Sequence, residues 1–567
     1  AGAPAPRPGS ARRRASPGVR GAPRLRYPRG MRRLFLGSAA IAVLAFAALF
    51  AGEFFLEWHR AGHPGAGAMS WAELNNAKLV DVLSPMARAY NNVLAMLIAT
   101  IGLAIPLTAN MHTPKLIEMF LRDRINRWVL TFMAVGAAHV LWVDYLIGPQ
   151  FAPRWAIAVS VYAAMVGWAL LIPYFFYVVR FVDPSRLLVR LREDAADIVR
   201  RVADRRRDPL EAQTALAVRV GQIGTVIIKS LDRDDRDVAA EGAWAIKVLL
   251  DHYAKQKARM PREWFVVDRA DFVGLSDEAL DMLSEARTWF EMRCLLQLEL
   301  GFLRALGRAS DTVSTFSDAT RVIGVRAVGH HDEQAIRLAI RFFNNYLREA
   351  IKALNLRAVY DVFHQYRRLA RELVDRPELL REVGRHFGYY ATMARTYGMV
   401  FAPQLAIFDL GFVTRRAYER ASPAGPDLLA AVLALPHRTG ADVHSMAVKA
   451  KLILGGFFAA GPHPAEAEQV RRNLADVDAD HVVRAEAELL AADRSFFEVT
   501  DRQLNLEFVP PERREPLRRF CRALLDGRAD APPAAAYGGS TAAEPSAGAD
   551  GRAGSTRSEP VDDDRST

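Results

Sequence analysis

Cysteine is nearly absent from this sequence: the 567 residues contain only two, Cys294 and Cys521. They lie far apart within polar helical patterns, so the chain has neither a disulfide framework nor the paired spacing of a structural metal site. We interpret both cysteines as reduced, structural thiols.

The usual motifs of catalysis are also absent. The sequence contains no phosphate-binding loop, no Gly-x-Ser-x-Gly elbow and no His-Glu-x-x-His motif. We therefore predict that the protein is not an enzyme and that it holds no cofactor and no metal.

Two clusters of metal-capable residues have simpler interpretations. The run 232–237 interleaves Asp with Arg and lacks the glycine of a calcium-binding loop, which favours a solvated turn between helices. In the run 330–333 (His-His-Asp-Glu), adjacent positions rarely converge on one ion, so we expect Asp332 to cap a helix.

Acidic residues are missing from the first 52 positions. Residues 1–33 carry ten arginines, whereas the whole chain has a net charge of +11. Without this segment the net charge falls to +1, so we predict no nucleic-acid-binding face and no nucleic-acid partner. We expect residues 1–32 to be a disordered basic tail. Two interpretations of it stay open: an arm on anionic lipid, or an extension upstream of a start at Met31.

Long apolar runs are present, and they are confined to the first third of the chain. The runs 128–148 and 155–179 each exceed 20 residues, enough to cross the ~30 Å hydrocarbon core of a bilayer at about 1.5 Å per residue. With two further runs they predict a transmembrane domain over 33–180 with four spans, at 34–57, 89–108, 128–148 and 155–179. The first run also fits a cleaved signal peptide, and this alternative stays open.

The loop charges give the spans a direction. Eighteen basic residues lie in the tail, in the 109–127 loop and after the fourth span, against four on the other side. By the positive-inside rule, both termini are expected in the cytoplasm. Tryptophans fall at the predicted span ends, as interfacial tryptophans do: Trp58, Trp71, Trp128 and Trp155.

Two short amphipathic segments are predicted to lie at the membrane surface. One covers 71–83, after a capping box at Ser70. The other follows Thr113-Pro114, a good helix start, and directly precedes the third span. It carries the charged residues Lys115, Arg122, Asp123 and Arg124.

Four polar residues fall inside the predicted spans. His139 and Asp144 lie in the third span, and Asn91 and Asn92 enter the second from the outer side. Ionisable groups at such depth are costly and are functional candidates by default, so the four could line a hydrated path. The alternative is that they form hydrogen bonds between helices and fix the packing.

From residue 181 to 526 the hydrophobic pattern becomes that of amphipathic helices separated by short polar breaks. Only 264–267 looks strand-like, so we predict an all-α chain: four transmembrane helices followed by a large helical cytoplasmic domain. The expected helices are 208–230, 237–257, 277–308, 332–355, 357–375, 377–399, 403–420, 440–459, 464–475, 478–494 and 511–526. Residues 527–567 are expected to be a disordered tail.

The order of these features resembles a known family. The run from Thr113 to Arg124, a span, the turn Phe151-Ala152-Pro153-Arg154, another span and a charged helix are similar to the bacterial predicted-membrane-protein family called "domain of unknown function 2254". The resemblance covers about residues 89–200. It implies this architecture and a bacterial inner membrane, and it supplies no active site.

Two functional hypotheses follow. In the first, a homo-oligomer of the spans forms a channel or transport path that the cytoplasmic domain regulates. In the second, the protein is a membrane-anchored scaffold or sensor that binds a cytosolic protein. The lipid bilayer is a partner in both.

Overall fold

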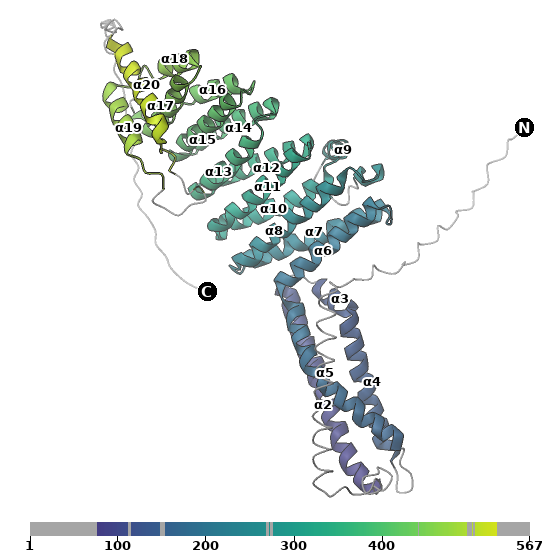
Figure 1. The fold of residues 1–567 in the computed structure, drawn as a ribbon. Coiled ribbons are helices and arrows are strands. Elements are labelled where there is room, and N and C mark those ends of the chain that lie inside the picture. The colour runs from purple at the N-terminus through teal and green to yellow at the C-terminus, as the bar shows by residue number, and fades with distance from the viewer. Residues whose placement is uncertain are drawn as a thin grey trace, which may run out of the picture.

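In the computed structural model, the described part of the chain comprises residues 76–111, 115–147, 154–267, 276–439, 442–495 and 505–529, with Phe272 and Arg502. This part forms a narrow stem of long helices that carries a curved stack of helices (Figure 1). The predicted all-α class is confirmed. The strands described are the two-residue pair β1 (Arg438–Thr439) and β2 (Asp442–Val443). The predicted first span, the N-terminal tail and residues 530–567 of the predicted C-terminal tail lie outside the described residues, whereas residues 527–529 are helical and extend α20 (Pro511–Ala529).

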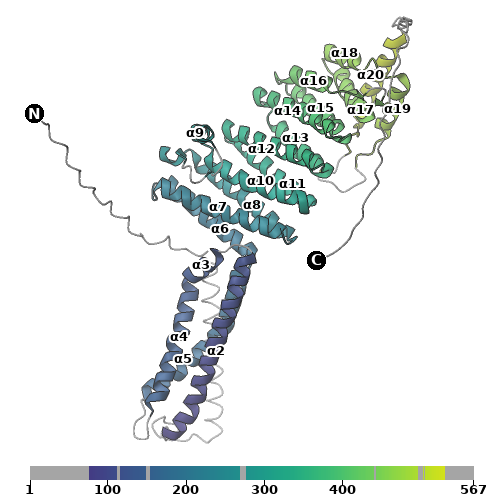
Figure 2. The ribbon, with the colours of Figure 1, turned by 180° about the vertical axis from the view of Figure 1, so that it is seen from behind.

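The stem consists of three long helices that run side by side in both views (Figures 1 and 2). They are α2 (Asn76–Met111), α4 (Arg124–Leu146) and α5 (Arg154–Val182), with the short α3 (Lys115–Arg122) between α2 and α4. Each long helix contains a candidate membrane span: Leu83–Thr108, Arg124–Leu146 and Trp155–Val182. These three spans match the predicted second, third and fourth.

The start of α2 corrects one prediction. Its described part begins at Asn76 and runs without a break past Pro85, so residues 76–83 belong to the same helix as the span rather than to a separate surface helix. Packing explains the continuity. The side chains of Leu83 and Ala87 are buried against Val140, Val143 and Ile157 of α4 and α5, which holds this end of α2 in place.

A fourth helix is also long and apolar enough to cross a membrane, namely α7 (Pro209–Leu231). In α7, 56% of the most apolar window is buried inside the protein, against 11% to 33% for the three stem spans. It packs against α6 (Pro184–Ala203), α8 (Arg236–Lys257) and α10 (Trp289–Arg308). A helix that is apolar all round and surrounded by protein is a core helix, so we place α7 in the stack.

The stack has two layers of antiparallel helices. One layer contains α7, α10, α12 (Glu333–Lys352), α14 (Pro377–Thr396) and α16 (Gly425–Ala434). The other contains α6, α8, α11 (Val313–Gly329), α13 (Leu356–Glu372), α15 (Phe401–Glu419), α17 (Ser445–Ala460) and α20 (Pro511–Ala529). Each helix packs on its successor in the layer and on helices of the opposite layer, as in helical solenoids. The other α-helices described in this part of the chain are α9 (Asp277–Glu285), α18 (Pro464–Asn473) and α19 (Ala479–Ala491).

The same turn recurs between helices of the stack. At the α11–α12 turn, His331 takes a left-handed conformation (φ 57°) and Asp332 then caps α12 by accepting from the Ala335 amide at 3.1 Å. The Asp332 amide donates to the Ala327 carbonyl at 2.9 Å, which completes a Schellman motif. The predicted cap at Asp332 is confirmed. The run 232–237 forms an equivalent turn, between α7 and α8, in which Asp235 is the cap.

Three details of the predicted secondary structure differ from the structure. The expected helix 277–308 divides into α9 and α10 around Arg287, which has φ 55°. The helices α11 and α16 were not expected. Finally, the strand-like segment forms a 3-10 helix, Arg262–Phe265. The Gln213 side-chain amide donates to the Trp264 carbonyl at 2.6 Å, so a side chain satisfies this backbone group instead of a neighbouring strand.

Candidate functional site

The polar residues predicted inside the spans connect different helices. The Ser84 hydroxyl on α2 donates to the Asp144 carboxylate on α4 at 2.5 Å. His139 Nδ1 on α4 lies 3.0 Å from the Ser160 hydroxyl on α5. These hydrogen bonds tie α4 to both of its neighbours at separate points.

The two asparagines behave differently. The Asn91 side chain donates to the Ala87 carbonyl of its own helix at 2.9 Å, and Asn92 is exposed on α2. None of the hydrogen bonds of these residues joins Asn91 or Asn92 to Asp144 or His139. A single cluster of all four side chains is therefore not assembled within the described stem.

The charged segment before the third span divides into an exposed and a buried part. Lys115 opens α3, Arg122 pairs with Glu118 at 2.8 Å, and Arg124 is exposed. Asp123 is fully buried instead and caps α4 by accepting from the Asn126 amide at 2.8 Å. Asp123 thus serves the junction between α3 and α4 rather than the membrane surface.

Asp123 belongs to a buried polar cluster at the junction between stem and stack, which sequence reasoning did not find. The Asn126 side-chain amide donates to the Phe120 carbonyl at 3.0 Å, and the Tyr174 hydroxyl donates to the Asn126 side chain. Burial raises the pKa of Asp123, and hydrogen bonds from the Asn126 amide and Tyr177 oppose this. We call Asp123, Asn126, Tyr174, Tyr177 and Arg190 the junction cluster.

Arg190 brings the first helix of the stack into the junction cluster. It lies on α6, is 6% exposed, and its guanidinium sits 4.4 Å from the centre of the Phe181 ring at the end of α5. Between these helices Asp183 caps α6, accepting from the Ser185 amide at 3.0 Å. The same few residues therefore end the stem, start the stack and fix the angle between them.

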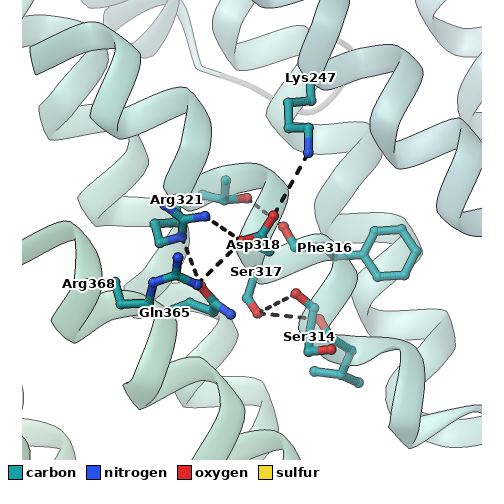
Figure 3. Close-up of polar contacts among 10 residues, drawn as sticks. Lys247, Ser314, Phe316, Ser317, Asp318, Arg321, Gln365 and Arg368 are labelled. Carbon is teal, nitrogen blue, oxygen red and sulfur yellow. Dashed lines mark hydrogen bonds and ion pairs between the residues drawn. The ribbon is translucent and has the colours of Figure 1, made fainter. Parts of the chain in front are cut away.

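Inside the stack, Asp318 on α11 is the centre of a charged network (Figure 3). It accepts from Arg321 at 2.5 Å and lies 3.9 Å from Lys247 of α8. Arg321 also donates to Gln365 of α13 at 2.9 Å. The network lines a cavity of about 390 Å³. Three cations, Lys247, Arg321 and Arg368, surround the single carboxylate of Asp318, which joins three neighbouring helices.

A second network surrounds Lys257. Its ammonium group donates to Glu291 and to Asp332, at 2.6 Å in both cases, beside a cavity of about 590 Å³. Both carboxylates come from other helices than the lysine, so this network also joins helices. Among the described residues, no group of His, Cys, Asp and Glu is arranged to hold a metal ion.

A third cavity, of about 630 Å³, opens between α13, α15, α17 and the segment before α20. At its wall, Arg502 forms a two-pronged ion pair with Asp409, 2.6 Å for each bond, and both side chains are almost completely buried. Sequence reasoning missed this pair because the partners are 93 positions apart.

One part of the chain matches a known protein family. Residues 32–233 match the family described as "Predicted membrane protein (DUF2254)". The match includes the stem, α6 and α7, and it confirms the resemblance inferred from the sequence. No curated protein and no solved structure matches the chain.

Proposed function

We propose that this chain, whose residues 32–233 match a family of predicted membrane proteins, is a membrane-anchored scaffold or sensor whose helical stack binds a cytosolic protein. In this proposal the stem anchors the protein in a bacterial inner membrane. The stack lies in the cytoplasm, in keeping with the basic residues of the loops next to the spans.

One edge of the stack carries the proposal. Consecutive helices are antiparallel, so every second turn faces the same edge. Two such turns, α12–α13 and α14–α15, expose apolar side chains: Leu354 (60%) and Leu356 (44%) in the first, Tyr397 (44%) and Val400 (66%) in the second. We call these four residues the apolar edge. Exposed apolar side chains on successive turns of a solenoid are typical of a protein-binding surface.

The two turns on the opposite edge next to these helices, α11–α12 and α13–α14, have a different character. They are joined by a hydrogen bond between Arg376 and His331 at 2.9 Å, and among the described residues neither turn exposes a large apolar side chain. Polar groups that already bond to one another, and to water, gain little from a partner. The contrast favours the apolar edge as the docking surface.

Charge indicates the chemistry of the partner. The exposed Arg357 and Arg395 lie within a few residues of the apolar edge. A protein segment with both apolar and acidic residues would complement this combination, since rim charges steer association while apolar anchors supply affinity.

Site-specific crosslinking tests the proposal. A photoreactive amino acid is placed at Val400 in the full-length protein in its native membrane, and at Arg376 on the opposite edge as the control. We expect a discrete adduct with one other protein from position 400 and none from 376. The substitution Val400→Asp should abolish co-purification of that same protein. An adduct formed equally at both positions, or only with a second copy of this chain, would contradict the proposal.

The oligomeric channel is the second candidate, and one observation favours it. Asn92 presents a polar amide on the exposed face of α2, where lipid offers no hydrogen-bond partner. A second copy packed on this face would satisfy it. A mass measurement in detergent separates the candidates, because spans of a single chain are too few to enclose a pore and a monomer therefore excludes this channel.

A further inference from the structure

The cavity between α13, α15 and α17 is unusually rich in arginine. Among the described residues, five arginines line it together with an apolar wall, and Glu512 is the one acidic residue that does so. We call this cavity the arginine pocket; its arginines are Arg367, Arg371, Arg415, Arg494 and Arg502. Its volume of about 630 Å³ lies in the range of sites for small organic ligands, roughly 300–1,000 Å³.

At the inner end of the arginine pocket, two arginines share one carboxylate. Asp409 receives both bonds from Arg502, and Arg367 approaches the same carboxylate at 3.4 Å. The Arg502 guanidinium also lies 4.5 Å from the centre of the Tyr360 ring. The carboxylate of Asp409 is thus already paired with two arginines, and this end of the pocket has a structural role.

Toward the outside, the remaining arginines have weaker partners. Arg371 pairs with its neighbour Glu372 at 2.8 Å. Arg415 lies 3.5 Å from Glu419, a carboxylate that Arg416 and Arg513 also contact, each at 3.1 Å. Arg494 is exposed and forms no ion pair with the described residues.

Within the part of the chain that the structure describes, the charges around the arginine pocket are therefore not balanced. Including Arg416 and Arg513, seven arginines of the described residues are grouped with four described carboxylates, those of Glu372, Asp409, Glu419 and Glu512. Burial, and after it the positive charge of Arg513, lower the pKa of Arg415 to about 10. A bound anion would offset both the burial and the repulsion.

The apolar wall adds a second requirement. Phe412 lies beneath two guanidinium groups, that of Arg367 at 4.7 Å and that of Arg415 at 5.0 Å from the ring centre. Beside it, further apolar side chains line the cavity: Phe408, Ile453, Leu454, Leu506 and Phe508. An inorganic ion would leave this surface uncovered.

We propose that the arginine pocket binds a phosphate-bearing organic molecule of nucleotide size. Its phosphate lies against Arg371, Arg415 and Arg494, and its ring or apolar part covers the wall next to Phe412. Several convergent guanidiniums favour phosphate, because each can donate two parallel bonds to its oxygens. This site lies apart from the apolar edge, and the proposal holds whether or not the stack binds a protein.

Equilibrium binding to the full-length protein in neutral detergent tests the proposal. The probes are ATP, GTP, short-chain phosphatidic acid and inorganic phosphate; the first two represent a soluble ligand and the third a lipid headgroup. We expect saturable binding of at least one organic probe, at least about tenfold tighter than inorganic phosphate. Arg415→Gln and Arg494→Gln should each weaken it about tenfold, the usual cost of one charge-assisted bond.

Two features keep the outcome interpretable. Arg494 is exposed, so Arg494→Gln should leave the fold intact even if Arg415→Gln does not. The exposed Arg395 on α14 does not line the pocket, and Arg395→Gln makes the same charge change as a control that should bind normally. Absence of saturable binding by every organic probe would overturn the proposal, as would equal affinity for inorganic phosphate or affinities unchanged in both pocket variants.

Discussion

The stem and the stack of this protein place their large apolar side chains differently. Large apolar side chains point outward from the stem, including Leu103 (72% exposed), Trp155 (87%) and Ile172 (67%). In the stack, the aromatic residues Trp264, Trp289 and Tyr346 are completely or almost completely buried. Apolar side chains that point outward, as in the stem, are stable in a lipid environment. Apolar side chains that point inward, as in the stack, are buried because the surroundings are water.

Polar residues repeat the contrast. The stem uses single hydrogen bonds between helices, such as Ser84 to Asp144, whereas the stack buries whole ion pairs such as Arg502 with Asp409. A broken bond should therefore cost less in the stem than a broken ion pair costs in the stack. The following predictions test this difference, from the largest effect to the smallest.

Removing the carboxylate of the buried pair should have the largest effect. Asp409→Ala leaves the Arg502 charge buried without its partner, and such changes cost about 3–5 kcal/mol of unfolding free energy. Denaturant unfolding of the detergent-solubilised protein measures the loss. Asp427 forms an ion pair with Arg381, and the Asp427 side chain is 61% exposed. Asp427→Ala breaks this exposed pair and should cost less than about 1 kcal/mol of unfolding free energy. Equal losses in both variants would show that burial is not the cause.

Acidic pH should lower the stability of the stack, because His364 is held neutral in the folded protein. Burial, and then the positive charges of Arg502 and Arg367, lower the pKa of His364 to about 3, below its ordinary value of 6.5. Since the folded form resists protonation, its stability is present above pH 6.5 and falls as the pH drops toward 3. Between pH 6.5 and 4 the loss should be about 3 kcal/mol, at about 1.4 kcal/mol for each pH unit.

The histidine effect is measured by unfolding at several pH values. His364→Gln should remove this part of the pH dependence, so the stability difference between variant and wild type should shrink toward acid. A parallel decline of both proteins would exclude His364 as the source.

In the stem, Ser84→Ala should have a smaller effect. The change removes the bond to Asp144, and hydrogen bonds between membrane helices contribute about 1 kcal/mol. Unfolding of the stem in mixed micelles measures it. Thr100→Ala is the control, because the Thr100 hydroxyl bonds to Met96 of its own helix and is exposed. If Ser84→Ala lowered the unfolding free energy by more than Asp409→Ala does, the expected difference between stem and stack would be contradicted.

The smallest effect is expected at a turn of the stack. Leu354 adopts φ 50°, which strains a residue with a Cβ atom and suits glycine. Leu354→Gly should therefore raise the melting temperature slightly, corresponding to less than about 1 kcal/mol. At the α14–α15 turn, Gly398 has φ 78°, and Gly398→Ala should lower it by a similar amount. If both substitutions shifted the melting temperature in the same direction, the role of the left-handed backbone at these two turns would be contradicted.

Part of this fold could be predicted because its signals are local. The three stem spans follow from length and hydropathy, and the cap at Asp332 follows from residue type. Other features depend on packing. The helix α11 contains Ser, Thr, Val and Gly, which are poor helix formers, and it is stabilised by close contact: a Cβ atom at Gly324 would lie 2.9 Å from Leu369.

The polar sites show the same limit. Sequence indicated that His139 and Asp144 are unusual, because an ionisable residue in an apolar run is visible without a structure. It could not indicate that their partners are Ser84 and Ser160, nor that Arg190 would lie near Asp123 from a distant helix. Pairings across 20 to 100 positions are determined by how helices pack, which local patterns do not encode.

Flux through reconstituted vesicles tests the central claim that the stem is an anchor and the stack is the working part. The full-length protein is placed in lipid vesicles loaded with ions or small solutes, beside the variants His139→Ala and Asp144→Ala. We expect leakage equal to that of empty vesicles for all three proteins, because the hydrogen bonds of these residues lead to neighbouring helices. A flux by the wild type that either variant alters would contradict the claim and establish a conducting stem.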